Sequence, residues 1–163
     1  MNKHTTVIYP GTFDPITYGH IDIIKRCFTC FDNVIIAIAT NETKKPLFSV
    51  KERKKMVEES VKDISKNIEV DCFSGLLVDY AKSKNIKNII RGLRALSDFE
   101  FEFQMVLTNR KLWKEMETIF MMPNEEFSYI SSRAIKEICA LGGDVSHFVT
   151  PGVEKKLKEK LLK

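Results

Sequence analysis

The segment TTVIYPGTFDPITYGH, residues 5–20, decides the fold of this chain. It begins with a short apolar and β-branched run, which predicts a buried strand over Thr5–Tyr9. A turn containing proline and glycine follows, and Thr17 is a suitable N-cap for a helix over Gly19–Phe31. A strand, a tight turn and a capped helix in direct succession form the first half of a βαβ unit.

The alternation of strand and helix continues along the rest of the chain. Further strands are expected at Asn33–Thr40, Ile68–Phe73, Asn88–Arg91 and Thr118–Met122, and further helices at Val50–Ser65, Leu76–Lys84, from about Ser97, at Ser131–Leu141 and within Glu154–Lys163. The first two strands are continuous apolar runs, which is typical of strands covered on both faces. We therefore expect a single α/β domain over residues 1–163. It would be Rossmann-like and doubly wound, with a five-stranded parallel sheet and helices on both faces.

In such sheets, ligands bind beyond the carboxyl ends of the strands, so the residues that follow each strand are the candidates for chemistry. Pro10, Pro46 and Pro123 are expected to lie in these loops, because proline cannot extend a central strand.

The segment DFEFEF, residues 98–103, fits two kinds of secondary structure. Its strict alternation indicates a strand, whereas Leu96, Phe99, Phe103, Val106 and Leu107 also share one face of a helix. We favour the helix, because good helix formers continue without a turn signal as far as Trp113. Phe101 and Met105 then form a second apolar stripe, which we expect to face another subunit.

Composition excludes several classes of function. A net charge of +4 over 163 residues suits anionic small molecules but is too weak to indicate a nucleic-acid partner. The longest clear apolar run, Val34–Ala39, is far shorter than the ~18 residues of a membrane span. The first residues lack the apolar stretch of a signal peptide, so the expected location is cytoplasmic, with no membrane partner.

The loop after the first strand has the residues of a phosphate site. Gly11 permits close backbone approach, Thr12 offers a hydroxyl, and the start of the next helix favours an anion. His20, in the first turn of that helix, could donate a hydrogen bond to a phosphoryl oxygen. The alternative is a capped helix with a partly buried histidine and no ligand.

These residues resemble a known family. Thr17-x-Gly19-His20 resembles the T/H-x-G-H signature of the cytidylyltransferase-like nucleotidyltransferases. The longer string over residues 9–20 closely resembles the bacterial branch of that family that acts on 4′-phosphopantetheine. The resemblance implies transfer of AMP from ATP to 4′-phosphopantetheine by direct in-line attack, which gives dephospho-coenzyme A and pyrophosphate.

The resemblance also implies roles for individual residues, by matching stretches that include Ile90-Arg91-Gly92-Leu93-Arg94 and Phe127–Arg133. The catalytic set is His20, Lys44, Arg94 and Thr12. The ATP-binding set is Thr12, Phe13, His20, Gly92, Leu93, Arg94, Glu102, Phe127, Ser128, Tyr129, Ile130, Ser131, Ser132 and Arg133. The set that binds phosphopantetheine is Thr12, Lys44, Leu77 and Arg91. Arg133 stands where the family has a small polar residue.

By their patterns alone, several of these residues have simpler interpretations. Lys44 could be a solvated loop lysine, Glu102 an exposed charge, Leu77 a core residue, and Ser131 and Ser132 helix caps without a ligand. Mg²⁺ is expected to arrive with ATP, because the sequence shows no dedicated carboxylate cage. The resemblance implies a homohexamer.

Competing functions remain open from the residues. Within the family, the acceptor could be nicotinamide mononucleotide, or the nucleotide could be CTP. Outside it, the chain could be a non-enzymatic α/β module of receiver or flavodoxin type. A receiver needs an acidic cluster at the strand ends, however, and Asp14 stands alone after the first strand.

Overall fold

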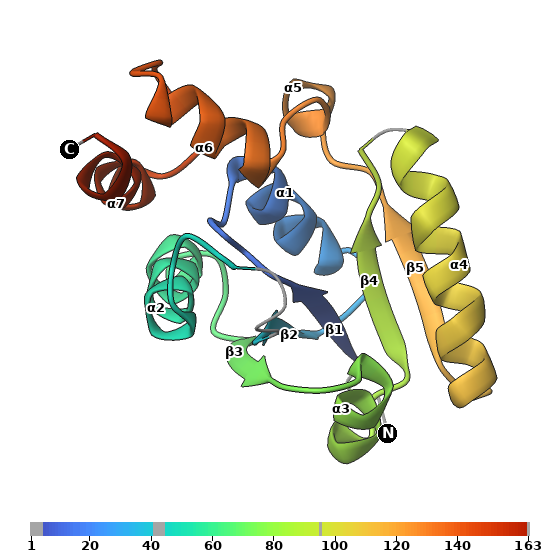
Figure 1. The fold of residues 1–163 in the computed structure, drawn as a ribbon. Coiled ribbons are helices and arrows are strands. Elements are labelled where there is room, and N and C mark those ends of the chain that lie inside the picture. The colour runs from blue at the N-terminus through green and yellow to red at the C-terminus, as the bar shows by residue number, and fades with distance from the viewer. Residues whose placement is uncertain (1–4, 41–44, 95, 163) are drawn as a thin grey trace.

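A five-stranded parallel sheet with the order β3-β2-β1-β4-β5 forms the centre of the computed structural model, which describes residues 5–40, 45–94 and 96–162 (Figure 1). The strands are β1 (Thr6–Gly11), β2 (Asn33–Ala39), β3 (Ile68–Phe73), β4 (Asn88–Gly92) and β5 (Glu117–Met121). Each predicted strand lies within two residues of its observed bounds. The α/β class and the parallel sheet are confirmed.

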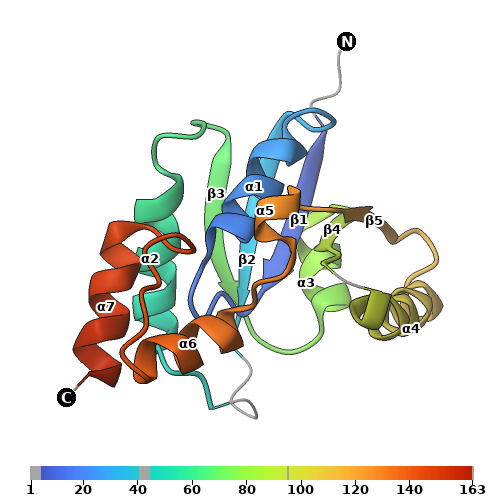
Figure 2. The same ribbon diagram turned by 90° about the horizontal axis from the view of Figure 1, so that it is seen from above.

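Helices cover both faces of the sheet (Figures 1 and 2). One face packs against α1 (Tyr18–Cys27), α2 (Val50–Val61), α6 (Ser132–Ala140) and α7 (Pro151–Leu161), and the other against α3 (Leu77–Lys84) and α4 (Leu96–Leu112). The predicted ends of the first two helices were too late, since α1 stops at Cys27 and α2 at Val61. A single turn, α5 (Glu125–Ser128), was not predicted.

The expectation that Pro10 lies in a loop was wrong, because β1 continues through it to Gly11 and pairs with β2. The carbonyl of Pro10 accepts a hydrogen bond from the Arg91 side chain at 3.1 Å. In a strand, the N–H and the C=O of one residue point toward the same neighbouring strand. For Pro10 that neighbour is β4, so the position where an N–H would stand also faces β4. The backbone pairing between β1 and β4 is limited to Ile8 and Ile89 and does not reach Pro10, which has no N–H to donate to β4.

The strand order determines where along the carboxyl edge of the sheet a ligand site is expected. From β1 the chain moves to β2 and β3 on one side, and later to β4 and β5 on the other, so β1 and β4 are the neighbours at the switch point. The loops that leave their carboxyl ends diverge and leave a crevice between them.

Helix α4 carries apolar side chains that the single chain leaves exposed. Phe99 packs against Phe120 of β5, with ring centroids 6.0 Å apart. Even so, Phe99, Phe101 and Phe103 are 42%, 61% and 45% exposed, and Met105 is 42% exposed. The helix is therefore confirmed as apolar on more than one side. Among the described residues, no helix is both long and apolar enough to span a membrane.

Candidate active site

A cavity of about 420 Å³ opens at the carboxyl ends of β1 and β4, where the sheet topology places the crevice. Five segments of the described chain contribute to its wall: the β1–α1 connection with the start of α1, residues 45–46 before α2, the end of β4, helix α4, and the stretch from Pro123 into α6. Of the predicted site residues, the cavity is lined by Thr12, Phe13, His20, Arg91, Gly92, Arg94, Glu102, Phe127, Ile130, Ser131 and Ser132.

The β1–α1 loop is shaped by the ring of Phe13. This residue has a left-handed φ of 49° and is 2% exposed, so its ring is buried. A Cβ on Gly11 would lie 2.9 Å from that ring, which explains the glycine at this position. The Phe13 ring centroid is 5.5 Å from that of Tyr9 and 5.1 Å from that of His20. The Phe13 ring therefore packs against the imidazole of His20.

His20 and Thr17 form a reciprocal cap at the start of α1. The Thr17 hydroxyl accepts from the His20 amide at 3.4 Å, and Nδ1 of His20 accepts from the Thr17 amide at 3.0 Å. A backbone amide can only donate, so Nδ1 carries no proton and the neutral ring is protonated at Nε2. The cap thereby sets the tautomer and leaves an N–H donor on the far side of the ring.

The charge state of His20 follows from its surroundings. Burial, together with the positive charges of Arg94 and Arg91, lowers the pKa of His20 to about 4. The imidazole is consequently neutral at physiological pH. It can act there as a hydrogen-bond donor but not as a cation.

The start of α1 has fewer free amides than the sequence suggested. The Tyr18 amide donates to the Phe148 carbonyl at 2.8 Å, and the His20 amide is taken by the Thr17 hydroxyl. A phosphate at this helix end would therefore depend more on side chains than on backbone N–H groups.

Arg91 and Glu102 form a bidentate pair across the cavity wall. Nε and Nη2 of Arg91 donate to the two carboxylate oxygens of Glu102, at 2.7 and 2.5 Å. Glu102 is 9% exposed, so the interpretation of this residue as a plain exposed charge was wrong. Arg94 lies nearby, and its Nη1 donates to the Ile130 carbonyl at 3.3 Å. The Glu102 carboxylate neutralises much of the charge of the Arg91 guanidinium and fixes its orientation.

The start of α6 brings two serines to the cavity. Ser131 caps the helix by accepting from the Ala134 amide at 3.1 Å. The Ser132 hydroxyl donates to the Pro15 carbonyl at 2.8 Å and so joins α6 to the β1–α1 loop. Lys136, one turn further along α6, also lines the cavity and forms an ion pair with Asp14 at 2.5 Å.

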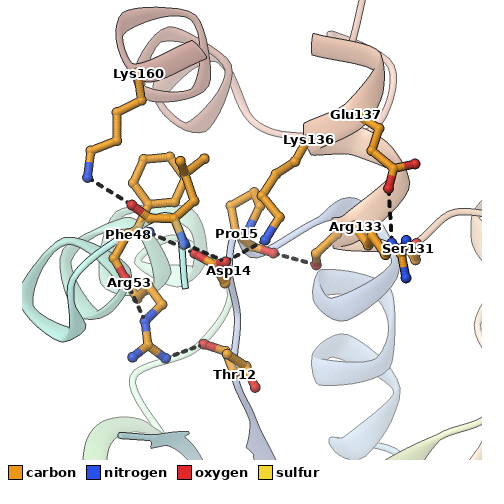
Figure 3. A network of polar contacts seen from close by, with 12 residues as sticks. Thr12, Asp14, Pro15, Phe48, Arg53, Ser131, Arg133, Lys136, Glu137 and Lys160 are labelled. Atoms are coloured by element: carbon orange, nitrogen blue, oxygen red, sulfur yellow. Dashed lines mark hydrogen bonds and ion pairs between the residues drawn. The ribbon is translucent and has the colours of Figure 1, made fainter. Parts of the chain in front are cut away.

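The other predicted residues that the structure describes do not line the cavity. Arg133 is not among the lining residues; it pairs with Glu137 on its own helix (Figure 3), and its side chain is 87% exposed. Leu77 is partly buried and packs against the apolar cluster on the α3 side of the sheet, and its predicted contact with phosphopantetheine stays a prediction. Leu93, Ser128 and Tyr129 are not among the lining residues. Lys44 falls outside the described residues.

Sequence reasoning overlooked Lys45, Asp14 and Lys136 in the cavity wall. Lys136 had a usable signal, since it stands four residues after Ser132 and therefore on the same helix face. Asp14 was considered only as a possible member of an acidic cluster. Its actual partners come from distant parts of the chain, which no local pattern indicates.

Comparison with known proteins identifies the class. Residues 8–138 match the model of the cytidylyltransferase-like family, and the chain belongs to that family. Within it, the chain is 54% identical over 153 residues to the phosphopantetheine adenylyltransferase of Alkaliphilus metalliredigens, a match that covers 94% of this chain and 97% of the relative. It is also 54% identical over 156 residues to the phosphopantetheine adenylyltransferase of Caldanaerobacter subterraneus, covering 96% and 97%. Membership of this family excludes the receiver and flavodoxin alternatives.

Solved structures confirm the fold. The Plasmodium falciparum nicotinic acid mononucleotide adenylyltransferase superposes with a TM-score of 0.68 at 16% identity, covering 96% of each chain. A bifunctional NMN adenylyltransferase/ADP ribose pyrophosphatase from Francisella tularensis has a TM-score of 0.68 at 14% identity, covering 96% of this chain and 50% of that one. At these identities the likeness concerns the fold alone.

Proposed function

We propose that this chain transfers the adenylyl group of ATP to 4′-phosphopantetheine, releasing pyrophosphate and forming dephospho-coenzyme A. One observation carries the proposal: Thr12, His20, Arg94 and Ser132, which come from separate segments, line a single cavity. The relatives at 54% identity, which are named phosphopantetheine adenylyltransferases, support this acceptor over nicotinamide mononucleotide.

The attacking group in this reaction is the phosphate monoester of the acceptor. Its second pKa is about 6, so it is largely ionised at neutral pH and needs no general base. The geometry of His20 agrees with this requirement, because Nδ1 accepts from the Thr17 amide and Nε2 carries the proton, so the ring has no free nitrogen to act as a base. The protein's task is to align the two substrates and to stabilise charge on the α-phosphate.

Within this proposal, the residues of the cavity wall have the following roles. His20 donates from Nε2–H to an oxygen of the α-phosphate in the transition state. Arg94 neutralises charge on the phosphates, and Thr12 orients the attacking phosphate. Arg91 holds the phosphopantetheine side, with its direction set by Glu102. A role for Lys44 on the reacting phosphates stays a prediction, whereas Lys45 supplies a positive charge in the wall itself.

Mg²⁺ is proposed to arrive bound to the phosphates of ATP. No group of three or more His, Cys, Asp or Glu side chains in the described part of the chain could hold a metal. Asp14 and Glu102, carboxylates of the cavity wall, are already paired with Lys136 and Arg91. The ion would supply charge neutralisation on the triphosphate when bound.

A homohexamer and a cytoplasmic location are further parts of the proposal. The exposed apolar side chains of α4 support self-association, since contiguous apolar surface of this kind marks protein interfaces. Sedimentation velocity would test the assembly, with an expected mass of about six times 18.8 kDa.

An assay of pyrophosphate release tests the activity directly. The purified chain would be incubated with ATP, Mg²⁺ and either 4′-phosphopantetheine or nicotinamide mononucleotide, and CTP would replace ATP in a parallel series. Release is expected only with ATP and 4′-phosphopantetheine together. Equal or faster release with nicotinamide mononucleotide, or with CTP, would overturn the assignment.

A further inference from the structure

Arg53, on α2, is a buried cation that touches three separate segments of the backbone. The residue is only 1% exposed. The guanidinium donates to the carbonyl of Ala39 at 3.0 Å, and to those of Thr12 at 2.6 Å and Phe48 at 3.1 Å, the two contacts that can be followed in Figure 3. These carbonyls belong to the β1–α1 loop, the end of β2 and the segment before α2. One side chain therefore joins three segments at the carboxyl edge of the sheet.

Two further side chains, Asp14 and Lys160, bind the backbone of the segment before α2. The Asp14 carboxylate accepts from the amides of Leu47 at 3.0 Å and Phe48 at 2.9 Å. Lys160 of α7 donates to the Leu47 carbonyl at 3.0 Å, and its ammonium lies 5.0 Å from the centroid of the Phe48 ring. The backbone at residues 47–48 is thus fixed by side chains on both its donor and its acceptor groups (Figure 3).

The anchored segments lead directly into the cavity wall. Thr12 lines the cavity, while its carbonyl is bonded to Arg53 behind the wall. Lys45 and Pro46 also line the cavity, immediately before the anchored Leu47 and Phe48. Arg53 itself is not among the lining residues. It can therefore affect a bound substrate only through the segments that it holds.

We propose that Arg53 is a positioning residue for adenylyl transfer: it fixes the place of Thr12 relative to residues 45–48, and so the alignment of the two substrates. The inference rests on the proposed function. Burying an arginine is costly unless its donors are satisfied, and here they are spent on backbone that carries cavity residues rather than on core elements remote from the site. Misplacing a reacting group by about 1 Å can cost about 10²-fold in rate.

The test compares variants of Arg53 with a core variant that is expected to lower stability without touching the cavity. Arg53→Met keeps an unbranched apolar stem but removes the guanidinium with every donor, and Arg53→Lys restores a single ammonium. The control is Leu157→Ala on α7, which removes a fully buried side chain that does not line the cavity. Each variant is measured at a temperature below its thermal unfolding midpoint. The measurements are kcat, the KM of both substrates and the Kd of a non-hydrolysable ATP analogue.

A positioning role predicts a split between binding and turnover. For Arg53→Met, kcat should fall about 10²-fold, whereas the Kd of the ATP analogue should change by less than about threefold. Arg53→Lys should recover at least part of kcat, and Leu157→Ala should keep the wild-type kcat despite its lower stability. If Arg53→Met does not fold, a loss of kcat of more than about tenfold in folded Arg53→Lys supports the role.

Two results would overturn the inference. One is a kcat of the Arg53 variants close to that of the wild type, and the other is an equal loss of kcat in Leu157→Ala, which would mean that destabilisation alone explains the effect. Failure of the proposed function gives a different result, because the wild-type protein would then release no pyrophosphate from ATP and 4′-phosphopantetheine.

Discussion

The backbone amide of Thr17 donates a hydrogen bond to Nδ1 of His20 over 3.0 Å, and this contact sets the chemistry of the cavity. It caps α1 and, at the same time, places the imidazole proton on Nε2. The histidine is therefore both a structural residue and the proposed donor to the α-phosphate. Substitutions that keep one of these roles and remove the other can separate them.

His20→Asn and His20→Gln form such a pair. The asparagine oxygen can take the place of Nδ1 as acceptor, but its side chain does not reach the position of Nε2. We expect His20→Asn to stay within about 1 kcal/mol of the wild-type stability and to lose about 10²- to 10³-fold in kcat. His20→Gln keeps a donor near Nε2 and should lose less activity but more stability. Thermal unfolding and steady-state kinetics measure both, and near-normal turnover in His20→Asn would contradict the role.

The lowered pKa of His20 predicts a pH-dependent stability of the ligand-free protein. The folded pKa is about 4 and the ordinary value is 6.5, so between these values the unfolded chain binds more protons. The contribution of the neutral His20 side chain to the unfolding free energy is therefore fully present above pH 6.5, and it is lost as the pH falls toward 4. Between pH 7 and pH 4.5 the wild type should lose about 2 kcal/mol more than His20→Asn. Urea unfolding at the two pH values measures this difference.

Comparison with His20→Asn removes the contribution of acidic groups. Burial alone would raise the pKa of Asp14, but the hydrogen bonds from Lys136 and from the amides of Leu47 and Phe48 outweigh it and lower the pKa below 3.8. Its contribution is present above that range and is lost at still lower pH, in both proteins equally. Parallel pH curves for the two proteins would contradict the His20 assignment.

Removing the charge of Glu102 should release Arg91 into the cavity. Glu102→Gln loses the bidentate ion pair in a largely buried setting, and we expect a loss of about 2 kcal/mol in unfolding free energy. Pyrophosphate should bind more tightly to the variant at low salt, because the local positive charge is no longer neutralised. Isothermal titration calorimetry with pyrophosphate measures the affinity.

A matched surface pair serves as the control for Glu102→Gln. Glu117 pairs with Arg110 at 2.6 Å, but both side chains are about half exposed. Glu117→Gln should therefore change stability by less than about 1 kcal/mol and leave pyrophosphate affinity unchanged. If the two variants behave alike, burial of the Arg91–Glu102 pair has no energetic consequence.

The exposed apolar side chains of α4 predict an assembly that one charge can disrupt. Phe101 is 61% exposed, and Phe101→Asp should shift the sedimentation profile toward smaller species. Leu141, after α6, is 90% exposed and serves as the control, so Leu141→Asp should keep the wild-type profile. An unchanged profile for Phe101→Asp would place the interface elsewhere.

Much of the fold could be predicted because its signals are local. The apolar run of β1, the cap at Thr17 and the 3.6-residue periods of the helices each depend on residues within a few positions of one another. Strand alternation with helices then restricts the sheet to a parallel, doubly wound form. The failures at Pro10 and at the ends of α1 and α2 concern boundaries, where tertiary contacts compete with local preference.

The sequence by itself determined the order of the elements, the capped turn after β1 and the edge of the sheet at which ligands would gather. Only the tertiary structure decided which charges meet: Lys136 reaches Asp14 across 122 positions, and Arg53 reaches Thr12 across 41. It also decided that Glu102 is buried against Arg91 while Arg133 faces solvent. The physical reason is that periodicity encodes a face or a cap, whereas the partner of a buried charge depends on how distant segments pack around it.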